Sequence, residues 1–149
     1  MSLPSEADAV AAALADVVAE HDKRWSSLDF VGIAQLWEHD SPAPMYVGDE
    51  YAAPLMGADE LDRHWARVSS RLKAATLSST LHAFDVVDDA IVRAVLLSRW
   101  RLTGRESDRQ RTGASWITWL LIRRQGRLRI FHQMESQVYL GPDDRERLR

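Results

Sequence analysis

The last third of the chain contains long runs rich in apolar and β-branched residues, which predict β-strands. Three runs follow one another almost without interruption, at residues 90–103, 115–124 and 128–136. The turn Arg124-Gln125-Gly126-Arg127 joins the last two, and Gly126 can adopt the positive φ that a hairpin of this length requires. A fourth run, residues 79–87, precedes them and turns through Asp88-Asp89. The pattern predicts a meander of four antiparallel strands.

Apolar residues near the start of the chain recur every three or four positions, as they do along the buried face of a helix. The first such stripe is made of Val10, Leu14, Val17, Val18 and Trp25. His21 falls within this stripe. Ser5 followed by Asp8 has the form of a helix N-cap with an acid three residues later, so a helix is predicted to begin there and to break at Ser26-Ser27.

Two further helices are predicted before the strands. The second has Asp29 near its cap, and Ser41-Pro42-Ala43-Pro44 ends it because proline cannot continue a helix. Its buried side comprises Phe30, Ile33, Leu36 and Trp37. The third starts after Gly57 with Asp59 as its cap, and His64 lies at the edge of its apolar face. That face comprises Leu61, Trp65, Val68 and Leu72.

The segment between the second and third helices, residues 45–56, contains two short strand-like pieces around Gly48-Asp49-Glu50. It predicts an irregular hairpin. The element order is therefore helix, helix, short hairpin, helix and four antiparallel strands. Long strands after a helical half favour an α+β fold in which one curved sheet wraps around three N-terminal helices. Such a sheet usually encloses a pocket.

Composition narrows the class of protein. The 149 residues predict a single domain, with a core at about residues 8–140 and a tail at 141–149. A net charge of −3 gives no reason to expect nucleic acid or an anionic membrane as a partner. The absence of cysteine excludes disulfides and thiolate chemistry. No apolar run is long enough to span a bilayer and no secretory signal opens the chain, so we expect a cytoplasmic protein.

The parity of the strands predicts which side chains face the pocket. In residues 90–103, one parity is apolar and ends at Trp100, while the other carries Arg93, Arg99 and Arg101. The apolar parity is expected to face inward, which places Trp100 in the interior. Residues 115–124 are apolar on both faces, so the outer face must also be covered. A second subunit is the usual cover, and the pattern predicts a homodimer formed through the sheet.

Three stretches resemble the nuclear transport factor two-like superfamily, and most closely its SnoaL-like and ketosteroid-isomerase-like members. They run from Leu28-Asp29-Phe30 to Leu36-Trp37, over Pro54-Leu55-Met56-Gly57, and from Gly126 to His132. The resemblance covers residues 8–140 and implies a cone-shaped α+β barrel of the cystatin-like type. Members include isomerases, polyketide cyclases, dehydratases, epoxide hydrolases and non-catalytic association domains, so the fold alone does not decide the chemistry.

The last strand can be read in two ways. Its polarity favours Ile130, His132, Met134 and Val138 facing the core. Alignment with similar proteins on the turn glycine instead points Phe131, Gln133 and Glu135 into the cone. The two readings agree if the face that carries Ile130 meets a dimer partner, and this is the arrangement we expect.

Glu135 is then the leading candidate for chemistry. In an apolar cone lined by Trp65, Trp100, Trp119 and Phe131, desolvation would raise the pKa of its carboxyl and make it a general acid or base near neutral pH. The alternative is a carboxylate paired with an Arg or His at the rim. Tyr46 and Gln133 complete the expected ligand-binding wall.

Two histidines are further candidates. His21 corresponds to the tyrosine of ketosteroid isomerases, so it could polarise a carbonyl or form a dyad with Glu135. The alternative for His21 is a hydrogen-bonded core residue. His64 could instead be the histidine that meets the ligand.

The acids of ketosteroid isomerases are not both present. Asp49 lies near the position of their catalytic base only if residues 45–50 contain an insertion, and without one Met45 takes that place. Their second acid corresponds to Ser115. Steroid isomerisation by that mechanism is therefore not expected.

No glycine-rich phosphate loop, nucleophile elbow or clustered metal-ligand spacing occurs, so we expect neither a cofactor nor a metal. Two functions stay open. The first is a cofactor-free enzyme that transfers a proton on a small hydrophobic or aromatic carbonyl compound, as an isomerase, cyclase or dehydratase. The second is a non-catalytic module of the same fold that binds a hydrophobic ligand or dimerises.

Overall fold

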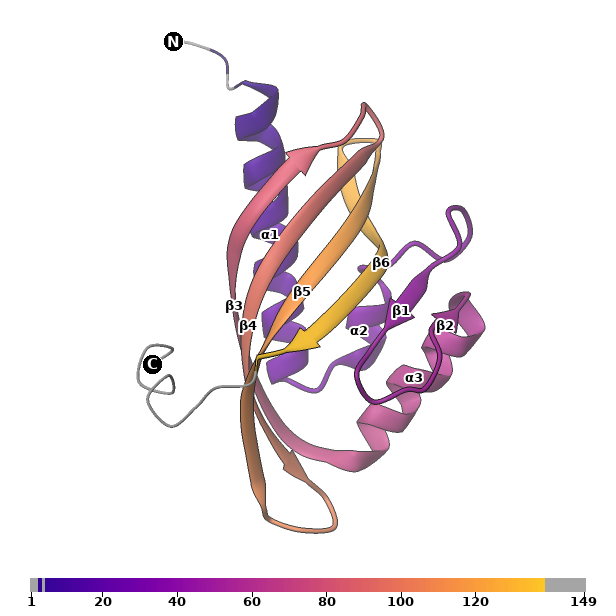
Figure 1. Ribbon diagram of the computed structural model, residues 1–149, viewed down its shortest axis with the longest axis vertical. Coiled ribbons are helices and arrows are strands. Elements are labelled where there is room, and N and C mark those ends of the chain that lie inside the picture. The colour runs from indigo at the N-terminus through magenta and orange to yellow at the C-terminus, as the bar shows by residue number, and fades with distance from the viewer. Residues whose placement is uncertain (1–2, 4, 139–149) are drawn as a thin grey trace.

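A computed structural model describes residue 3 and residues 5–138. The elements are α1 (Glu6–Ser26), α2 (Phe30–Ala34), β1 (Met45–Val47), β2 (Leu55–Met56), α3 (Ala58–Arg71), β3 (Leu72–Val86), β4 (Ile91–Gly104), β5 (Gln110–Arg124) and β6 (Arg127–Gln137). They follow the predicted order along the chain (Figure 1). The expected tail at 141–149 lies outside the described residues.

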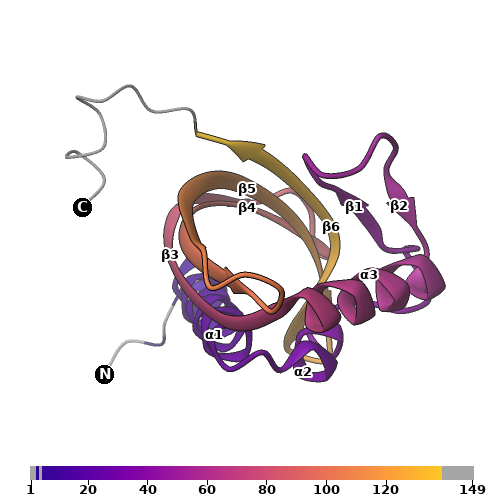
Figure 2. The same ribbon diagram turned by 90° about the horizontal axis from the view of Figure 1, so that it is seen from below.

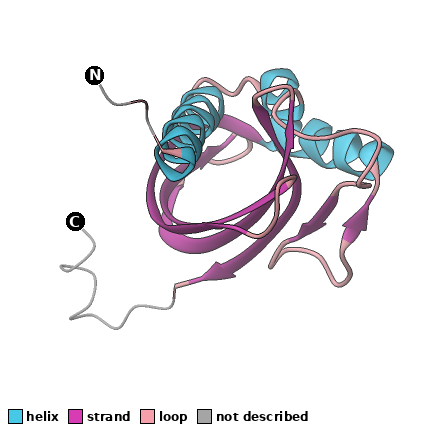
Figure 3. Cartoon of the chain, turned by 90° about the horizontal axis from the view of Figure 1, so that it is seen from above, coloured by secondary structure: helices cyan, strands magenta, loops and turns pink. Residues whose placement is uncertain are grey.

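One mixed sheet of six strands in the order β2-β1-β6-β5-β4-β3 forms the body of the molecule. β1 pairs with β6 in parallel, and the other pairs are antiparallel. Strands β3 to β6 curl around a common axis, with α1 and α2 on one side of the curl (Figure 2) and α3 beside the short strands (Figure 3). The predicted α+β fold with a curved mixed sheet is confirmed.

Helix α1 begins as its sequence predicts. The Ser5 side chain accepts a hydrogen bond from the Asp8 backbone N–H, and the Asp8 side chain accepts one from the Ser5 N–H. This reciprocal capping satisfies two N–H groups that a helix start leaves without partners. The buried side of the helix carries Val10, Leu14, Val18 and His21.

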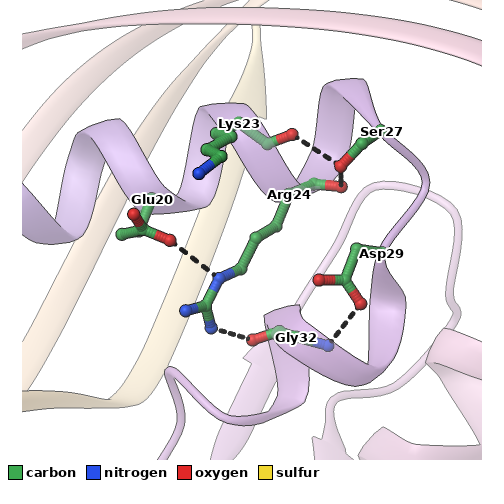
Figure 4. Close-up of polar contacts among 6 residues, drawn as sticks. All are labelled: Glu20, Lys23, Arg24, Ser27, Asp29 and Gly32. Atoms are coloured by element: carbon green, nitrogen blue, oxygen red, sulfur yellow. Dashed lines mark hydrogen bonds and ion pairs between the residues drawn. The ribbon is translucent and has the colours of Figure 1, made fainter.

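Arg24 holds the short helix α2 against the end of α1 (Figure 4). Its guanidinium donates to Glu20 Oε2 at 3.0 Å and to the carbonyl oxygen of Gly32. Asp29 caps α2 by accepting from the Gly32 N–H at 2.9 Å. A Cβ at residue 32 would lie 2.2 Å from the Asp29 carboxylate, so this close approach requires glycine.

Several predicted boundaries were wrong. Helix α2 ends at Ala34, and Trp37 instead forms a parallel bridge with Ile130. Helix α3 has Gly57 at its N-cap with no side-chain hydrogen bond, and the predicted cap Asp59 lies in the first turn. Strand β3 begins at Leu72, well before the predicted residue 79.

The predicted parity of β4 is confirmed. Val92, Ala94, Leu96 and Ser98 are fully buried, and Trp100 continues the same face. Arg93 on the opposite face is exposed and forms an ion pair with Asp85. The concave side of the sheet therefore carries both the core and the pocket wall.

Strand β6 changes its facing at a bulge. Leu120 pairs with His132 and Leu121 pairs with Ile130, which leaves Phe131 as an extra residue. Ile130 is therefore fully buried in the core, and Gln133 beyond the bulge is also buried. The expectation that Ile130 lies on the outer face with His132 and Met134 was wrong, because it assumed an unbroken two-residue period.

Among the described residues, no helix combines the length and the apolar character that crossing a membrane requires.

Candidate active site

A cavity of about 440 Å³ lies inside the curl, between the concave face of the sheet, α1, α3 and the β1–β2 hairpin. Its wall includes seven residues that the sequence nominated: His21, Tyr46, Asp49, His64, Trp100, Gln133 and Glu135. Helices α1 and α3, the hairpin, and strands β4 and β6 each contribute at least one of them. The volume is within the usual range of about 300–1,000 Å³ for small-molecule sites.

Glu135 is half-buried on the cavity wall, and its Oε1 accepts two hydrogen bonds. The Tyr46 hydroxyl lies 3.0 Å away, and the Gln133 side-chain amide donates at 2.6 Å. Burial, and to a lesser extent the nearby Glu50 carboxylate, raise the pKa of the Glu135 carboxyl to about 7. Because neither an Arg nor a His forms an ion pair with it among the described residues, the alternative of a paired rim carboxylate does not match the structure.

Gln133 is fixed from behind by the core. The indole N–H of Trp119 donates to Gln133 Oε1 at 2.8 Å, so the amide nitrogen of Gln133 is turned toward Glu135. Trp119 is fully buried. The chain from Trp119 through Gln133 sets the orientation of the Glu135 carboxyl.

His21 projects from α1 to the cavity wall and is 2% exposed. Neither ring nitrogen has a hydrogen-bond partner within the described part of the chain. Burial lowers the pKa of His21 to about 3, so its ring is neutral at physiological pH. The predicted dyad with Glu135 is absent from this structure, and so is the hydrogen-bonded core histidine that was its alternative. Both nitrogens are buried and without a partner among the described residues.

His64 is held by its neighbours on the other side of the cavity. Its Nδ1 lies 2.7 Å from the Tyr51 hydroxyl, which also accepts hydrogen bonds from Arg67. Burial, and to a lesser extent the positive charge of Arg67, lower the pKa of His64 to about 4. His64 is therefore a second neutral imidazole, with its face against the Tyr46 ring at 4.6 Å between centroids.

Trp100 forms one apolar wall. Its indole N–H donates to Ser115 Oγ at 3.2 Å, and its ring lies over Gly113 on β5. A Cβ at residue 113 would be 2.4 Å from the ring, so a side chain there would force the indole to move. Ser115 thus positions the Trp100 indole.

Asp49 lies at the rim rather than in the centre. It is exposed, and its Oδ2 accepts a hydrogen bond from the Gln137 N–H at 3.0 Å. This contact ties the β1–β2 hairpin to the end of β6.

Three residues expected on the wall line no part of this cavity. Trp65 and Trp119 are core residues, and Phe131 is the bulged residue of β6. Trp25 takes part in the wall instead, although its place in the α1 stripe suggested only a core role. Amphipathic spacing identifies a buried face but does not separate core from cavity.

Sequence reasoning also missed polar groups on the wall. Ser98 is fully buried, and its hydroxyl lies 2.6 Å from that of Ser79, which donates to Asp22. Glu50 was passed over because it sits in a loop next to the more prominent Asp49. Within the described residues, no three His, Asp or Glu side chains form a group that could hold a metal ion.

A scan against protein-family models and a search of curated protein sequences both found no match. Solved structures do match. A provisionally assigned scytalone dehydratase from Novosphingobium aromaticivorans is 7% identical, with a TM-score of 0.77 over 87% of this chain and 85% of that one.

Two further structures have the same architecture. A provisionally assigned dehydratase of the nuclear transport factor two-like family from Streptomyces avermitilis is 13% identical, with a TM-score of 0.74 over 87% of this chain and 97% of that one. A ketosteroid isomerase-like protein from Erwinia carotovora atroseptica is 11% identical, with a TM-score of 0.73 over 87% and 96%. With its curved mixed sheet and three helices, the chain has the nuclear transport factor two-like fold that the sequence resemblance implied.

Proposed function

We propose that the protein is a cofactor-free enzyme that transfers a proton on a small hydrophobic carbonyl compound, with Glu135 as its general base and acid. The observation that carries the proposal is the Glu135 carboxyl on a cavity wall, which forms no ion pair among the described residues and has a pKa of about 7. A group with that pKa exists in both protonation states near neutral pH, which a residue that takes up and returns a proton requires.

His21 supplies the second element of the proposed chemistry. A neutral imidazole carries one N–H donor, and this one has no protein partner within the described residues. When Glu135 removes a proton from the carbon next to a carbonyl, negative charge develops on the carbonyl oxygen. An N–H of His21 that bonds this oxygen would stabilise the charge in a site shielded from water.

The reaction then follows from where Glu135 returns the proton. Delivery to another carbon gives an isomerase, and delivery to a departing hydroxyl group gives a dehydratase. The Trp100 indole and the neighbouring Ile117 and Leu102 form an apolar wall that suits a flat ligand. Solved neighbours assigned as dehydratase and isomerase-like proteins are consistent with both outcomes.

Hydrogen–deuterium exchange on a simple ketone tests the proposal. The probe is 2-tetralone, a flat ketone with acidic protons beside the carbonyl, followed by ¹H NMR in D₂O. Wild-type protein should accelerate the exchange, and Glu135→Gln should reduce the acceleration by at least about 100-fold, the usual size of a general base's contribution. Glu106→Gln, an exposed change in the β4–β5 loop, is the matched control. Equal rates in the two variants would remove Glu135 as the base.

The alternative function is a non-catalytic module that dimerises, and exposed apolar side chains on the outer face of the sheet support it. Trp116 and Met134 are 37% and 47% exposed there, although both are large and apolar. They flank Thr118, which pairs with Met134 across β5 and β6. We propose that a second copy of the chain covers this face, and such a dimer is compatible with either function.

A further inference from the structure

The Tyr46 hydroxyl lies between two carboxyl groups. Its oxygen is 2.9 Å from Glu50 Oε1 and 3.0 Å from Glu135 Oε1. A phenol has one proton to donate, whereas an ionised carboxylate can only accept. The phenol can donate to either carboxylate, and a carboxyl group that becomes protonated can donate to the phenol oxygen. The three side chains therefore form a row along which a proton can pass.

The row runs from the interior to the solvent. All three residues line the cavity, but Tyr46 is only 3% exposed, whereas Glu50 is exposed in the loop between β1 and β2. When a ligand covers Glu135, the exposed Glu50 would still meet water, and the Tyr46 hydroxyl would connect the two carboxyl groups.

Gly48 allows this contact. A Cβ at that position would lie 2.5 Å from the Tyr46 ring and 2.6 Å from Glu50 Oε2. The φ of Gly48 is not in the left-handed region, so the backbone does not require glycine there. The missing side chain instead leaves the space in which Tyr46 and Glu50 meet.

The charged and titratable groups around this row come from several elements. Tyr46 faces the neutral ring of His64 on α3, and Glu135 faces Asp49 and Glu50 in the hairpin loop. The remaining such groups on the cavity wall are His21, Arg71 and Arg111. No ion pair involves Glu50 or Glu135 within the described residues. A proton shared between the two carboxyl groups would reduce the repulsion of their negative charges.

We propose that Tyr46 and Glu50 form a proton relay that connects Glu135 to solvent while the cavity is occupied. The proposal rests on the proposed role of Glu135 as general base. In one step, protonated Glu135 gives its proton to the Tyr46 oxygen as the Tyr46 proton passes to the Glu50 carboxylate. Glu135 becomes a carboxylate, Tyr46 stays neutral, and Glu50 becomes a carboxylic acid that releases its proton to water. The reverse sequence loads Glu135 with a proton.

A titration followed by ¹³C NMR tests the relay without any substrate. Protein labelled at the side-chain carboxyl carbon of glutamate is titrated from pH 5 to pH 9, and Glu50→Gln and Glu135→Gln assign the two signals. In the wild type, the Glu50 signal should move at the midpoint of the Glu135 signal because the two groups share a proton. Tyr46→Phe, which keeps the ring, should abolish that response, and Gly48→Ala should weaken it with both carboxyl groups still present. No response in the wild type, or the same response in Tyr46→Phe, would show that the phenol carries no proton between them.

A kinetic measurement tests whether the proton on Glu135 exchanges with solvent through Glu50. The probe is 3-cyclohexenone, whose conversion to 2-cyclohexenone in D₂O moves a proton from the carbon beside the carbonyl to the far end of the double bond. Deuterium at that end counts how often Glu135 exchanges its proton before returning it. Glu50→Gln, which changes an exposed side chain, should lower the deuterium content per product several-fold. Unchanged content would overturn the relay. If the probe is not converted at all, the proposed function fails, and the titration still decides whether the proton is shared.

Discussion

The ring of His21 meets the indole of Trp119 edge to face, with 5.0 Å between centroids and an interplanar angle of 78°. Trp119 donates its own N–H to Gln133, so this N–H is not shared with His21. The same tryptophan thus orients two parts of the site, the imidazole through packing and the Glu135 carboxyl through Gln133.

Replacement of His21 should lower the activity without lowering the stability. Burying polar atoms without partners costs about 1–3 kcal/mol, and His21→Leu removes both unpaired nitrogens. We expect the free energy of unfolding in urea to be unchanged or to rise by about 1 kcal/mol, while 2-tetralone exchange falls at least about 10-fold. A loss of stability above about 2 kcal/mol would mean that the ring is bonded in the folded protein.

The activity should depend on the ionisation of Glu135. Because a general base acts as the carboxylate, the exchange rate should rise with pH and level off above the pKa of about 7. The measurement is a rate profile from pH 5 to pH 9 with 2-tetralone. A profile that levels off below pH 5 would contradict a raised pKa for Glu135.

The ionisation of Glu135 should also make the stability of the protein fall as the pH rises. The folded pKa of Glu135, about 7, lies above its ordinary value of 4.5, so the folded state binds more protons than the unfolded state between these values. Stability from this group is present below pH 4.5 and is lost as the pH rises to 7. Glu135→Gln should therefore stabilise the protein at pH 8 more than at pH 4, as thermal unfolding at the two values would show. An equal effect at both would contradict this.

The two buried histidines should instead make the stability of the protein fall as the pH falls. Burial lowers the folded pKa values of His21 and His64 to about 3 and about 4, below the ordinary 6.5. The unfolded state takes up these protons first as the pH falls, so stability drops below pH 6.5. His21→Leu should reduce this acid sensitivity, and thermal unfolding at pH 7 and pH 5 measures it. The same drop in wild type and variant would assign the sensitivity to other groups.

Two tryptophans, one in the core and one on the cavity wall, allow the costs of the same substitution to be compared. Trp119 is fully buried, so Trp119→Ala should cost about 3–5 kcal/mol. Trp100 borders an existing cavity and is only half-buried, so Trp100→Ala should cost less than that but weaken ligand binding. Urea unfolding and fluorescence quenching by 2-tetralone measure the two effects. Equal costs would indicate that the Trp100 wall is closed.

The exposed apolar face of the sheet should mediate a homodimer that buries at least about 1,000 Å². Trp116→Glu should yield a monomer in sedimentation at micromolar concentration, because a charge in the middle of the interface would lose its hydration. Asp62→Asn, a change of an exposed side chain on α3, is the control. A wild-type monomer would remove the dimer, and the inward position of Glu135 would stand, because the structure places it there independently.

Much of the fold could be read from local pattern. The Ser5–Asp8 cap, the inward parity that ends at Trp100, and the turn at Gly126 all depend on residues close together in sequence. Steric limits and a strict two-residue period determine such features locally. They were confirmed because nothing distant competes with them.

The site depended on tertiary structure. The parallel pairing of β1 with β6 sets Tyr46 opposite Gln133, so that its hydroxyl reaches Glu135, 89 residues away along the chain. The bulge at Phe131 turns both Ile130 and Glu135 inward, which no regular period allows. Strand register and a bulge depend on how the whole sheet closes over its core. The sequence therefore named Glu135 and Tyr46, and only the packed sheet determined that they meet.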